Sequence, residues 1–189
     1  SLMAFTGKQQ NLLDETPQHC RQLKLPHPIL TDQDVERLRT VRRNDFRVAV
    51  LPALFDADGS DPAEALDRAL QDLIDAAEIE IAQGASLLIL SDREVTPGKA
   101  PIPSLLATAA LHHGLLRRGL RGEAGIVVES GEPREVMHFC LLCGYGANAV
   151  NPYMAFAAIG KLHRDGDLPA DVELDQLDDQ YITAVKKGI

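Results

Sequence analysis

Residues 61–90 run DPAEALDRALQDLIDAAEIEIAQGASLLIL, and this stretch decides the fold class. Asp61 followed by Pro62 is typical of a helix start, because an aspartate side chain caps free amide groups and proline suits the first helical position. The apolar residues that follow recur at three- and four-residue spacing, so the helix has one apolar face. Gly84 suits a left-handed helix cap, and the continuous apolar run 85–90 predicts a strand that is buried on both faces.

The same alternation of strand and helix extends to both sides of this stretch. Further apolar strands are predicted at 47–51, 124–128 and 147–150, and further helices at 104–118, 133–144 and 154–163, with a short helix opened by Thr31. Short connections between such units imply parallel pairing with right-handed crossovers. We therefore expect an α/β fold of repeated parallel β-α units, either a partial, rudimentary TIM-barrel-like domain or a small open sheet, since a full barrel usually takes about 250 residues.

Composition divides the chain into three parts. Residues 1–30 are polar and rich in proline, which predicts an extended N-terminal arm, and its first two residues are expected to be a remnant of expression. Residues 31–164 hold the parallel α/β core. Residues 165–180 carry seven acidic side chains and no basic one, so 165–189 is predicted to be an acidic connector followed by the start of a helix that leads to the next domain.

The charge and composition of the chain exclude several classes of partner. The formal net charge is −9 at pH 7 and no stripe of clustered Lys and Arg is present, so we expect neither nucleic-acid nor anionic-membrane binding. No apolar run approaches the ~20 residues that span a bilayer, and no signal peptide is recognised. Three cysteines do not make a disulfide framework, which favours the cytoplasm.

Two pairs of potential metal ligands are better explained by packing. Cys140 and Cys143 form a C-x-x-C motif, but both fall on a predicted helix and no second ligand cluster accompanies them, so we expect small buried side chains. His112 and His113 are neighbours on a helix and point about 100° apart, whereas joint metal ligation would need a spacing of three or four residues. We expect one to pack and the other to face outward, and we assign no metal residue.

Polar side chains follow three of the predicted strands at the points where the strands end: Ser91, Asp92, Arg93, Glu129, Ser130, Asn151 and Tyr153. The carboxyl ends of parallel strands share one edge, where α/β proteins place their ligand sites. Two interpretations stay open: helix capping with a buried Asp–Arg pair, or a rim that binds a small anion through the Arg93 guanidinium. Because no catalytic set can be assembled from spacing, we assign no catalytic or cofactor-binding residue.

Seven motifs occur in a fixed order along the chain: LLDETPQHC at 12–20, PILT at 28–31, ILSDR at 89–93, APIPSLLA at 100–107, VVESGE at 127–132, GYGANAVNPY at 144–153 and YITAVKKG at 181–188. Together they resemble the central domain of the glutamate synthase large subunit, in the ferredoxin- or NAD(P)H-dependent family. The resemblance spans nearly the whole chain.

The resemblance implies that the chain is part of an oxidoreductase that makes glutamate from glutamine and 2-oxoglutarate. In that family an amidotransferase domain releases ammonia, and a domain with FMN and an iron–sulfur cluster reduces 2-iminoglutarate. The central domain would be a scaffold and ammonia conduit between these two partner domains, inactive alone and without a cofactor in this segment. Cys20 would not be the amidotransferase nucleophile.

Two alternatives remain beside this interpretation. One is a standalone α/β protein that binds a small anion at the strand-end rim. The other is a homo-oligomer in which two copies complete a barrel and bind flavin.

Overall fold

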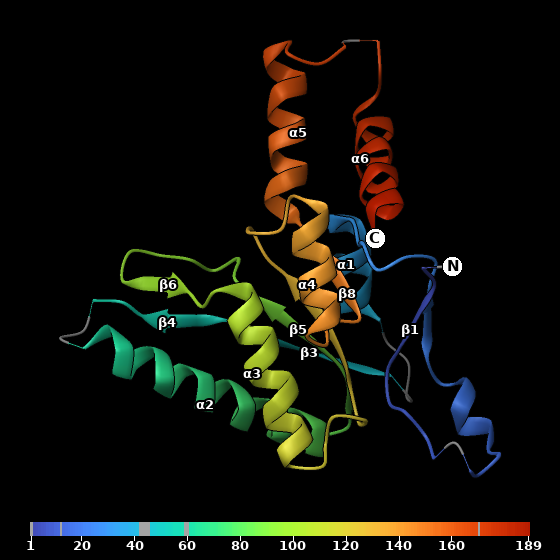
Figure 1. The fold of residues 1–189 in the computed structure, drawn as a ribbon, viewed down its shortest axis with the longest axis vertical. Helices are drawn as coiled ribbons and strands as arrows, with labels where there is room; N and C mark the ends of the chain where they lie inside the picture. Colours follow the sequence, from blue (N-terminus) through green and yellow to red (C-terminus); the bar gives the residue numbers. More distant parts are fainter. Residues whose placement is uncertain (1, 12, 42–45, 59–60, 170) are drawn as a thin grey trace.

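The structure, a computed structural model, describes residues 2–11, 13–41, 46–58, 61–169 and 171–189. Its elements alternate between strands and helices along most of the chain (Figure 1). In order they are β1 (Ala4–Thr6), the 3-10 helix η1 (Pro17–Cys20), β2 (Leu23–Leu25), α1 (Asp32–Thr40), β3 (Arg47–Pro52), β4 (Leu54–Asp56), α2 (Pro62–Ala82), β5 (Ala85–Ser91), β6 (Lys99–Pro101), α3 (Ser104–Arg117), β7 (Gly125–Glu129), α4 (Val136–Gly144), β8 (Ala149–Asn151), α5 (Tyr153–Asp165) and α6 (Leu174–Gly188).

A four-stranded parallel sheet in the order β3-β5-β7-β8 forms the centre of the molecule. Its register pairs Pro52 with Ser91, Ser91 with Glu129, and Glu129 with Asn151, so the carboxyl ends of all four strands are level. This confirms the α/β class with repeated parallel units. Within the described residues the strands do not close into a barrel, as expected for a partial barrel-like domain.

Helix α2 starts and ends as its sequence predicts. The Asp61 carboxylate accepts hydrogen bonds from the backbone N–H groups of Ala63 and Glu64, at 3.1 and 3.0 Å. Gly84 follows the last turn with a φ of 92°, in the left-handed region that favours glycine. Thr31 caps α1 in the same way, because its hydroxyl accepts from the N–H of Asp34 at 3.2 Å.

Both faces of the sheet are covered. Helices α2, α3 and α4 pack on one face, where their buried residues meet Leu88, Leu90, Ile126 and Val128. The other face is covered by α1 and the segment around β2, which pack on Leu87, Ile89, Val127 and Ala149. Every residue of β5 is buried as a result, which explains the continuous apolar run.

The N-terminal segment contributes to this sheet. β1 and β2 pair as an antiparallel ribbon, and Ile29 then lies parallel to Val150 of β8. Leu30 donates its N–H to the carbonyl of Val150 at 2.9 Å, and Val150 donates to the carbonyl of Pro28 at 2.7 Å. Residues 28–30 therefore extend the β8 edge of the sheet, although the sequence pattern predicts an arm. Pro26 and Pro28 at the start of this short stretch hide its strand pattern in the sequence.

Strands β4 and β6 form an antiparallel ribbon that the sequence does not reveal. The sequence pattern predicts no strand or helix between residues 91 and 103, but residues 99–101 pair with the chain just after β3. Each strand is three residues long, which is too short to show a periodic pattern.

The last two helices, α5 and α6, lie side by side and project together from the sheet (Figure 1). Phe156 of α5 meets Tyr181 of α6 edge to face, with ring centroids 5.8 Å apart. Helix α6 begins at Leu174, within the segment that the sequence predicts as an acidic connector, and its first turns bury Leu177 between acidic neighbours. Helix α4 begins at Val136, three residues later than predicted, because its N-cap Glu135 is in an extended conformation. The division into arm, core and connector stays a prediction.

In the part of the chain that the structure describes, no helix is both long and apolar enough to cross a membrane.

Candidate functional site at the carboxyl ends of the strands

The structure brings together all seven polar residues that follow the predicted strands. Ser91, Glu129 and Asn151 end three neighbouring strands in register, so their side chains point to the same face of the sheet. This is the face of Ile89 and Val127, two positions earlier, and it is the face covered by α1. The three polar residues are buried between the sheet and α1.

The Glu129 carboxylate is the centre of the site and is 1% exposed. It accepts a hydrogen bond from the Ser91 hydroxyl and from two guanidinium groups. Arg39 of α1 donates through Nη2 at 2.6 Å, and Arg93 donates through Nε, also at 2.6 Å. A carboxylate so far from water is stable as an anion only if it is paired in this way.

Arg93 links three separate parts of the chain. Besides Glu129, it contacts Asp32 of α1 at 2.9 Å, and its guanidinium carbon lies 4.2 Å from the centre of the Tyr153 ring. Burial opposes its charge, but the hydrogen bond to Glu129 and the charge of Asp32 together raise the pKa of Arg93. Its positive charge is therefore already committed to two carboxylates and one aromatic ring.

Asp92 organises the opposite side of the strand ends. Its carboxylate accepts hydrogen bonds from the Ser130 hydroxyl, from the Gly131 N–H at 3.2 Å and from the Tyr153 hydroxyl at 2.7 Å. Burial, followed by this bond to Asp92, raises the pKa of Tyr153, so the phenol stays protonated. The sequence interpretation of an Asp–Arg pair did not name the aspartate. In the structure Arg93 pairs with the buried Glu129 and with the half-exposed Asp32, while Asp92 binds hydroxyl and amide groups.

Asn151 holds the N-terminal segment against the sheet. Its Nδ2 donates to the carbonyl of Leu30 and to the Asp32 carboxylate, both at 2.9 Å. The residue is fully buried, and its Oδ1 has no hydrogen-bond partner among the described residues. One amide thus joins β8 to the start of α1.

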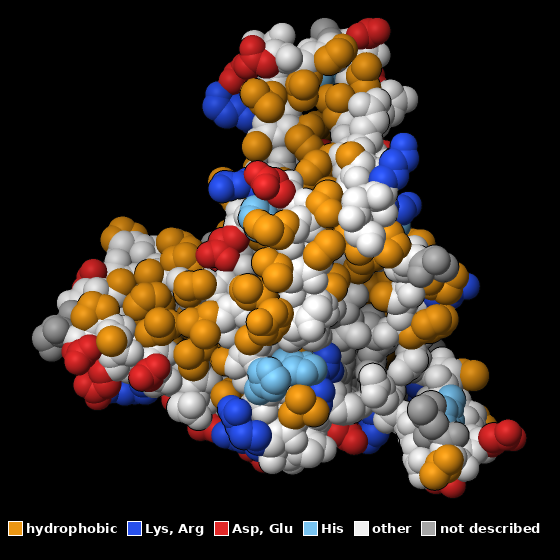
Figure 2. Space-filling view, in the orientation of Figure 1, with side chains coloured by type: hydrophobic (Ala, Val, Ile, Leu, Met, Phe, Trp, Pro, Cys, Tyr) orange, Lys and Arg blue, Asp and Glu red, His pale blue; other side chains and the backbone are white. Residues whose placement is uncertain are grey.

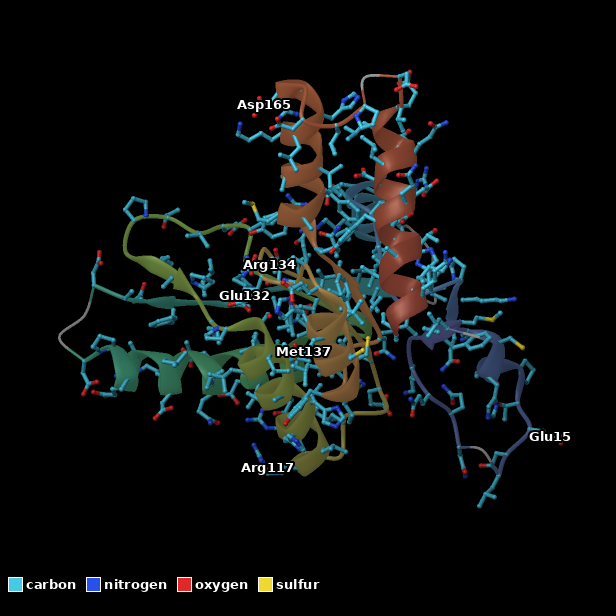
Figure 3. All side chains as sticks on the ribbon, turned by 45° about the horizontal axis from the view of Figure 1, so that its top comes forward. Glu15, Arg117, Glu132, Arg134, Met137 and Asp165 are labelled. Atoms are coloured by element: carbon cyan, nitrogen blue, oxygen red, sulfur yellow. The ribbon has the colours of Figure 1, made fainter. Side chains whose placement is uncertain are left out.

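Sequence reasoning missed four residues of this region: Asp32, Arg39, Ser104 and Glu132. The Glu132 carboxylate accepts hydrogen bonds from both the N–H and the hydroxyl of Ser104, the first residue of α3. A side chain from a distant loop therefore caps this helix. Figure 3 shows Glu132 and Arg134 near the junction of α3, α4 and α5. No local signal could have found these contacts, because the partners are 28 to 119 positions apart in the chain.

We call the nine residues joined by these contacts the strand-end network: Asp32, Arg39, Ser91, Asp92, Arg93, Glu129, Ser130, Asn151 and Tyr153. Each of its charged groups has a partner inside the network. Its hydrogen bonds connect β5, β7, β8, α1 and α5. These contacts fix the relative positions of the five elements, which suits structural support rather than proton transfer. Among the described residues, two buried atoms of the network, Arg39 Nε and Asn151 Oδ1, have no hydrogen-bond partner.

The candidate metal ligands lie elsewhere. His112 is half-buried and its Nδ1 accepts from the Arg121 guanidinium at 3.0 Å, whereas His113 is exposed, which confirms the predicted division of roles. Cys143 is half-buried, but Cys140 is exposed, so the prediction of a buried side chain is wrong there. Cys140 lies next to the buried Phe139 and therefore faces the outside of α4. Among the described residues, no group of three or more His, Cys, Asp and Glu could hold a metal ion.

Comparison of the sequence with known proteins shows which family the chain is similar to. A family model described as the glutamate synthase central domain matches residues 1–189. The chain is 39% identical over 189 residues to the glutamate synthase [NADPH] large chain of Bacillus subtilis, covering all of this chain and 12% of that protein. It is 34% identical over 191 residues to the glutamate synthase [NADH] of Schizosaccharomyces pombe, covering 9% of it. It is 34% identical over 204 residues to the chloroplastic ferredoxin-dependent glutamate synthase of Oryza sativa, covering 12%. The chain thus spans about a tenth of the length of the curated relatives it matches.

Proposed function

Since this chain belongs to the glutamate synthase central domain family, we propose that it connects and positions catalytic domains that lie elsewhere in a longer parent chain. In this proposal an amidotransferase domain releases ammonia from glutamine, and an FMN-binding domain uses that ammonia and 2-oxoglutarate to make glutamate. FMN and an iron–sulfur cluster are bound outside these 189 residues. The central domain is inactive alone and works in the cytoplasm.

The strand-end network is the observation that carries the scaffold role. Glu129, the most buried acid of the network, is 1% exposed and accepts hydrogen bonds from Ser91 and from two arginines, so it is not open to a substrate. Groups committed in this way stiffen the strand ends. A stiff connecting domain keeps the two partner domains at a constant separation, which a relay of a small intermediate requires.

We further propose that ammonia passes along the rim of the strand ends. Tyr153 is half-buried at this rim, and its hydroxyl oxygen, whose proton is donated to Asp92, can still accept a hydrogen bond from neutral ammonia without adding a charge that would trap it. Met154 is half-exposed beside Tyr153 at the start of α5, so added bulk at this position should narrow the path.

The scaffold role predicts that the purified chain lacks both partial activities. After incubation with FMN and desalting, we expect no flavin absorbance, and we expect no glutamine hydrolysis above the blank. Stoichiometric retention of FMN would refute the assignment of a purely connecting role.

The conduit is tested separately in the full-length parent protein. Met154→Trp should lower glutamine-dependent glutamate formation while leaving glutamine hydrolysis and ammonia-dependent formation unchanged. Met137→Trp on α4 adds the same bulk at another exposed methionine and serves as the control. Equal effects of the two variants would refute a conduit along this rim and leave the scaffold role standing.

The alternative of a small-anion site at the rim is weakened by the contacts of Arg93. Its guanidinium already pairs with Glu129 and Asp32, so an incoming carboxylate would have to displace one of them. We expect 2-oxoglutarate to leave the melting temperature of the chain unchanged. A rise in melting temperature that Arg93→Ala abolishes would favour the alternative.

A further inference from the structure

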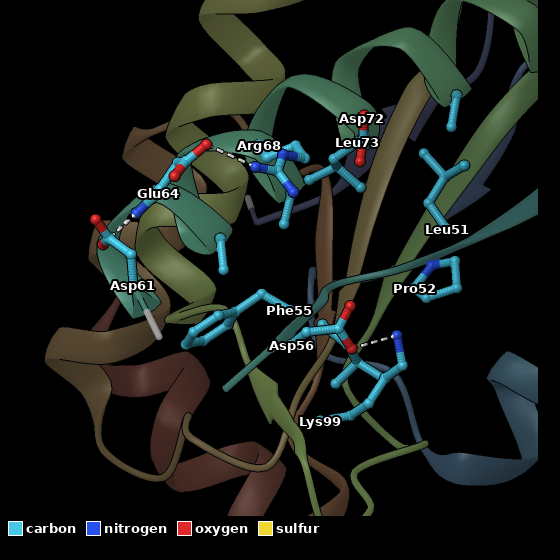
Figure 4. A pocket seen from close by; sticks show the side chains of 14 residues that line it. Leu51, Pro52, Phe55, Asp56, Asp61, Glu64, Arg68, Asp72, Leu73 and Lys99 are labelled. Atoms are coloured by element: carbon cyan, nitrogen blue, oxygen red, sulfur yellow. Dashed lines mark hydrogen bonds and ion pairs between the residues drawn. The ribbon is translucent and has the colours of Figure 1, made fainter. Parts of the chain in front are cut away.

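A groove of about 480 Å³ lies between α2 and the ribbon of β4 and β6, away from the strand-end network (Figure 4). Leu51, Leu54, Phe55 and Leu73 contribute apolar side chains to it. Leu54 and Phe55 are only half-buried, so part of their apolar surface faces water. Figure 2 shows hydrophobic side chains gathered over the part of the molecule that β4, β6 and α2 occupy in Figure 1.

The groove is lined mainly by residues of helices and strands rather than by loops. The chain before β4 is bonded to the sheet, because Ala53 donates to the carbonyl of Ser91 at 2.8 Å and accepts from Ile102 at 2.9 Å. On the opposite wall, α2 presents Ala65 and Ala69, whose small side chains leave space that larger residues would fill. A preformed apolar groove of this kind binds without a large ordering cost.

The rim of the groove is acidic. Four carboxylates and two cations line it. Arg68 pairs with Glu64 at 2.7 Å and Lys99 pairs with Asp56 at 2.9 Å, as the dashed lines in Figure 4 show. Among the described residues no salt bridge reaches the remaining two acids, Asp61 and Asp72. The rim therefore keeps negative charge, and α2 as a whole carries six acidic side chains against one basic one.

We propose that this groove docks a segment of the parent chain, outside the 189 residues, in which apolar side chains are flanked by Lys or Arg. Apolar residues would fill the groove while the basic ones face the acidic rim, which is how amphipathic segments bind complementary grooves. Nucleic acid and anionic membranes are repelled by this rim. The parent chain is the source because about nine-tenths of the relatives' length lies outside this domain, and a tethered segment has a high effective concentration.

The groove is tested by photo-crosslinking in the full-length parent protein. A benzoylphenylalanine replaces Asp72 at the rim, and in a matched control it replaces Asp67, an acid of the same helix that does not line the groove. Mass spectrometry should identify one cross-linked peptide of the same polypeptide, rich in Lys or Arg beside apolar residues, for position 72 and not for position 67. An equal mixture of isotope-labelled and unlabelled protein distinguishes a link within one chain from a link between copies.

Substitutions in the groove then test the chemistry of the contact. With the probe at position 72, Glu64→Lys and Asp56→Lys should each lower the cross-linked yield. The expected change is roughly two- to fivefold, the change in a binding constant that the loss of one exposed charge pair causes. Ala69→Leu, which fills the groove without a charge change, should lower the yield as well. Asp171→Lys on the loop before α6 should have no effect. A cross-link to a separate protein or a second copy, an acidic cross-linked segment, or no cross-link would each overturn the proposal.

Discussion

Replacing Glu129 by Gln should destabilise the chain more than any substitution of an exposed acid. Gln keeps the shape of the side chain and can still accept from Ser91, but it removes the anion that faces Arg39 and Arg93. Breaking a fully buried ion pair costs about 3–5 kcal/mol. The two guanidinium side chains are 28% and 34% exposed, so water partly compensates, and we expect a loss of about 2–3 kcal/mol.

Urea unfolding of the 189-residue chain, followed by circular dichroism, measures this loss directly. For a chain of this size, 2–3 kcal/mol corresponds to a fall in melting temperature of roughly 4–12 °C. The control is Glu123→Gln, the same substitution in a surface pair with Lys8, where we expect less than about 1 kcal/mol.

Two results would refute this reasoning. If Glu129→Gln costs no more than Glu123→Gln, the strand-end network does not stabilise the fold. If Glu129→Gln and Arg93→Gln are additive in a double-mutant cycle, the ion pair between them contributes nothing, since coupled residues deviate from additivity by about 0.5–3 kcal/mol.

Three further predictions follow from single residues. Gly146→Ala should lower the melting temperature by the equivalent of about 1–3 kcal/mol, because Gly146 has a φ of 115° and a Cβ there would overlap the His112 ring; a melting temperature unchanged from wild type would contradict this. Asp178→Asn should stabilise the chain at pH 7.5 and have little effect at pH 4. Burial and neighbouring carboxylates raise the pKa of Asp178 to about 6, so the folded state binds this proton more tightly than the unfolded state does. The free energy of unfolding of the unsubstituted chain therefore falls as the pH rises from about 4 through 6. Melting curves at both pH values check this, and an equal effect at both would count against it. Burial raises the pKa of the Cys143 thiol, whereas Cys140 is exposed, so a thiol reagent should modify Cys140 well before Cys143. Peptide mapping of a time course measures the order of modification, and the reverse order would contradict the structure.

Segments with strong local signals were predictable. The α2 helix has a capping aspartate, an apolar face of helical period and a terminal glycine. Each of these signals depends only on residues that are close together in the sequence. The β5 run is so apolar that only a doubly covered strand can accommodate it. Once parallel strands are predicted, the alignment of Ser91, Glu129 and Asn151 at one edge follows from topology alone.

The resemblance motifs and the strand-end network coincide. The stretches 89–93, 127–132 and 144–153 contain most of the residues that hold the strand ends together. The sequence therefore pointed to the correct edge of the sheet. It did not distinguish a rim open to ligands from a rim whose groups bind one another.

Features built from distant residues needed the tertiary structure. The β4–β6 ribbon depends on pairing across more than forty positions, and neither strand is long enough to have a pattern of its own. The early start of α6 depends on Leu177 finding a buried position beneath acidic neighbours. The exposed side of α4 that carries Cys140 depends on which face Phe139 occupies.

The amino-acid sequence by itself determined the α/β class, most strands and helices, the position of the polar rim and the family resemblance, since these rest on periodicity, caps and short motifs. The tertiary structure decided that Arg93 pairs with Glu129 rather than Asp92, that Arg39 and Asp32 complete the network, and that α2 borders an acidic groove. The physical reason is that ion pairs and grooves depend on distances between side chains far apart in the chain, which local propensity does not encode.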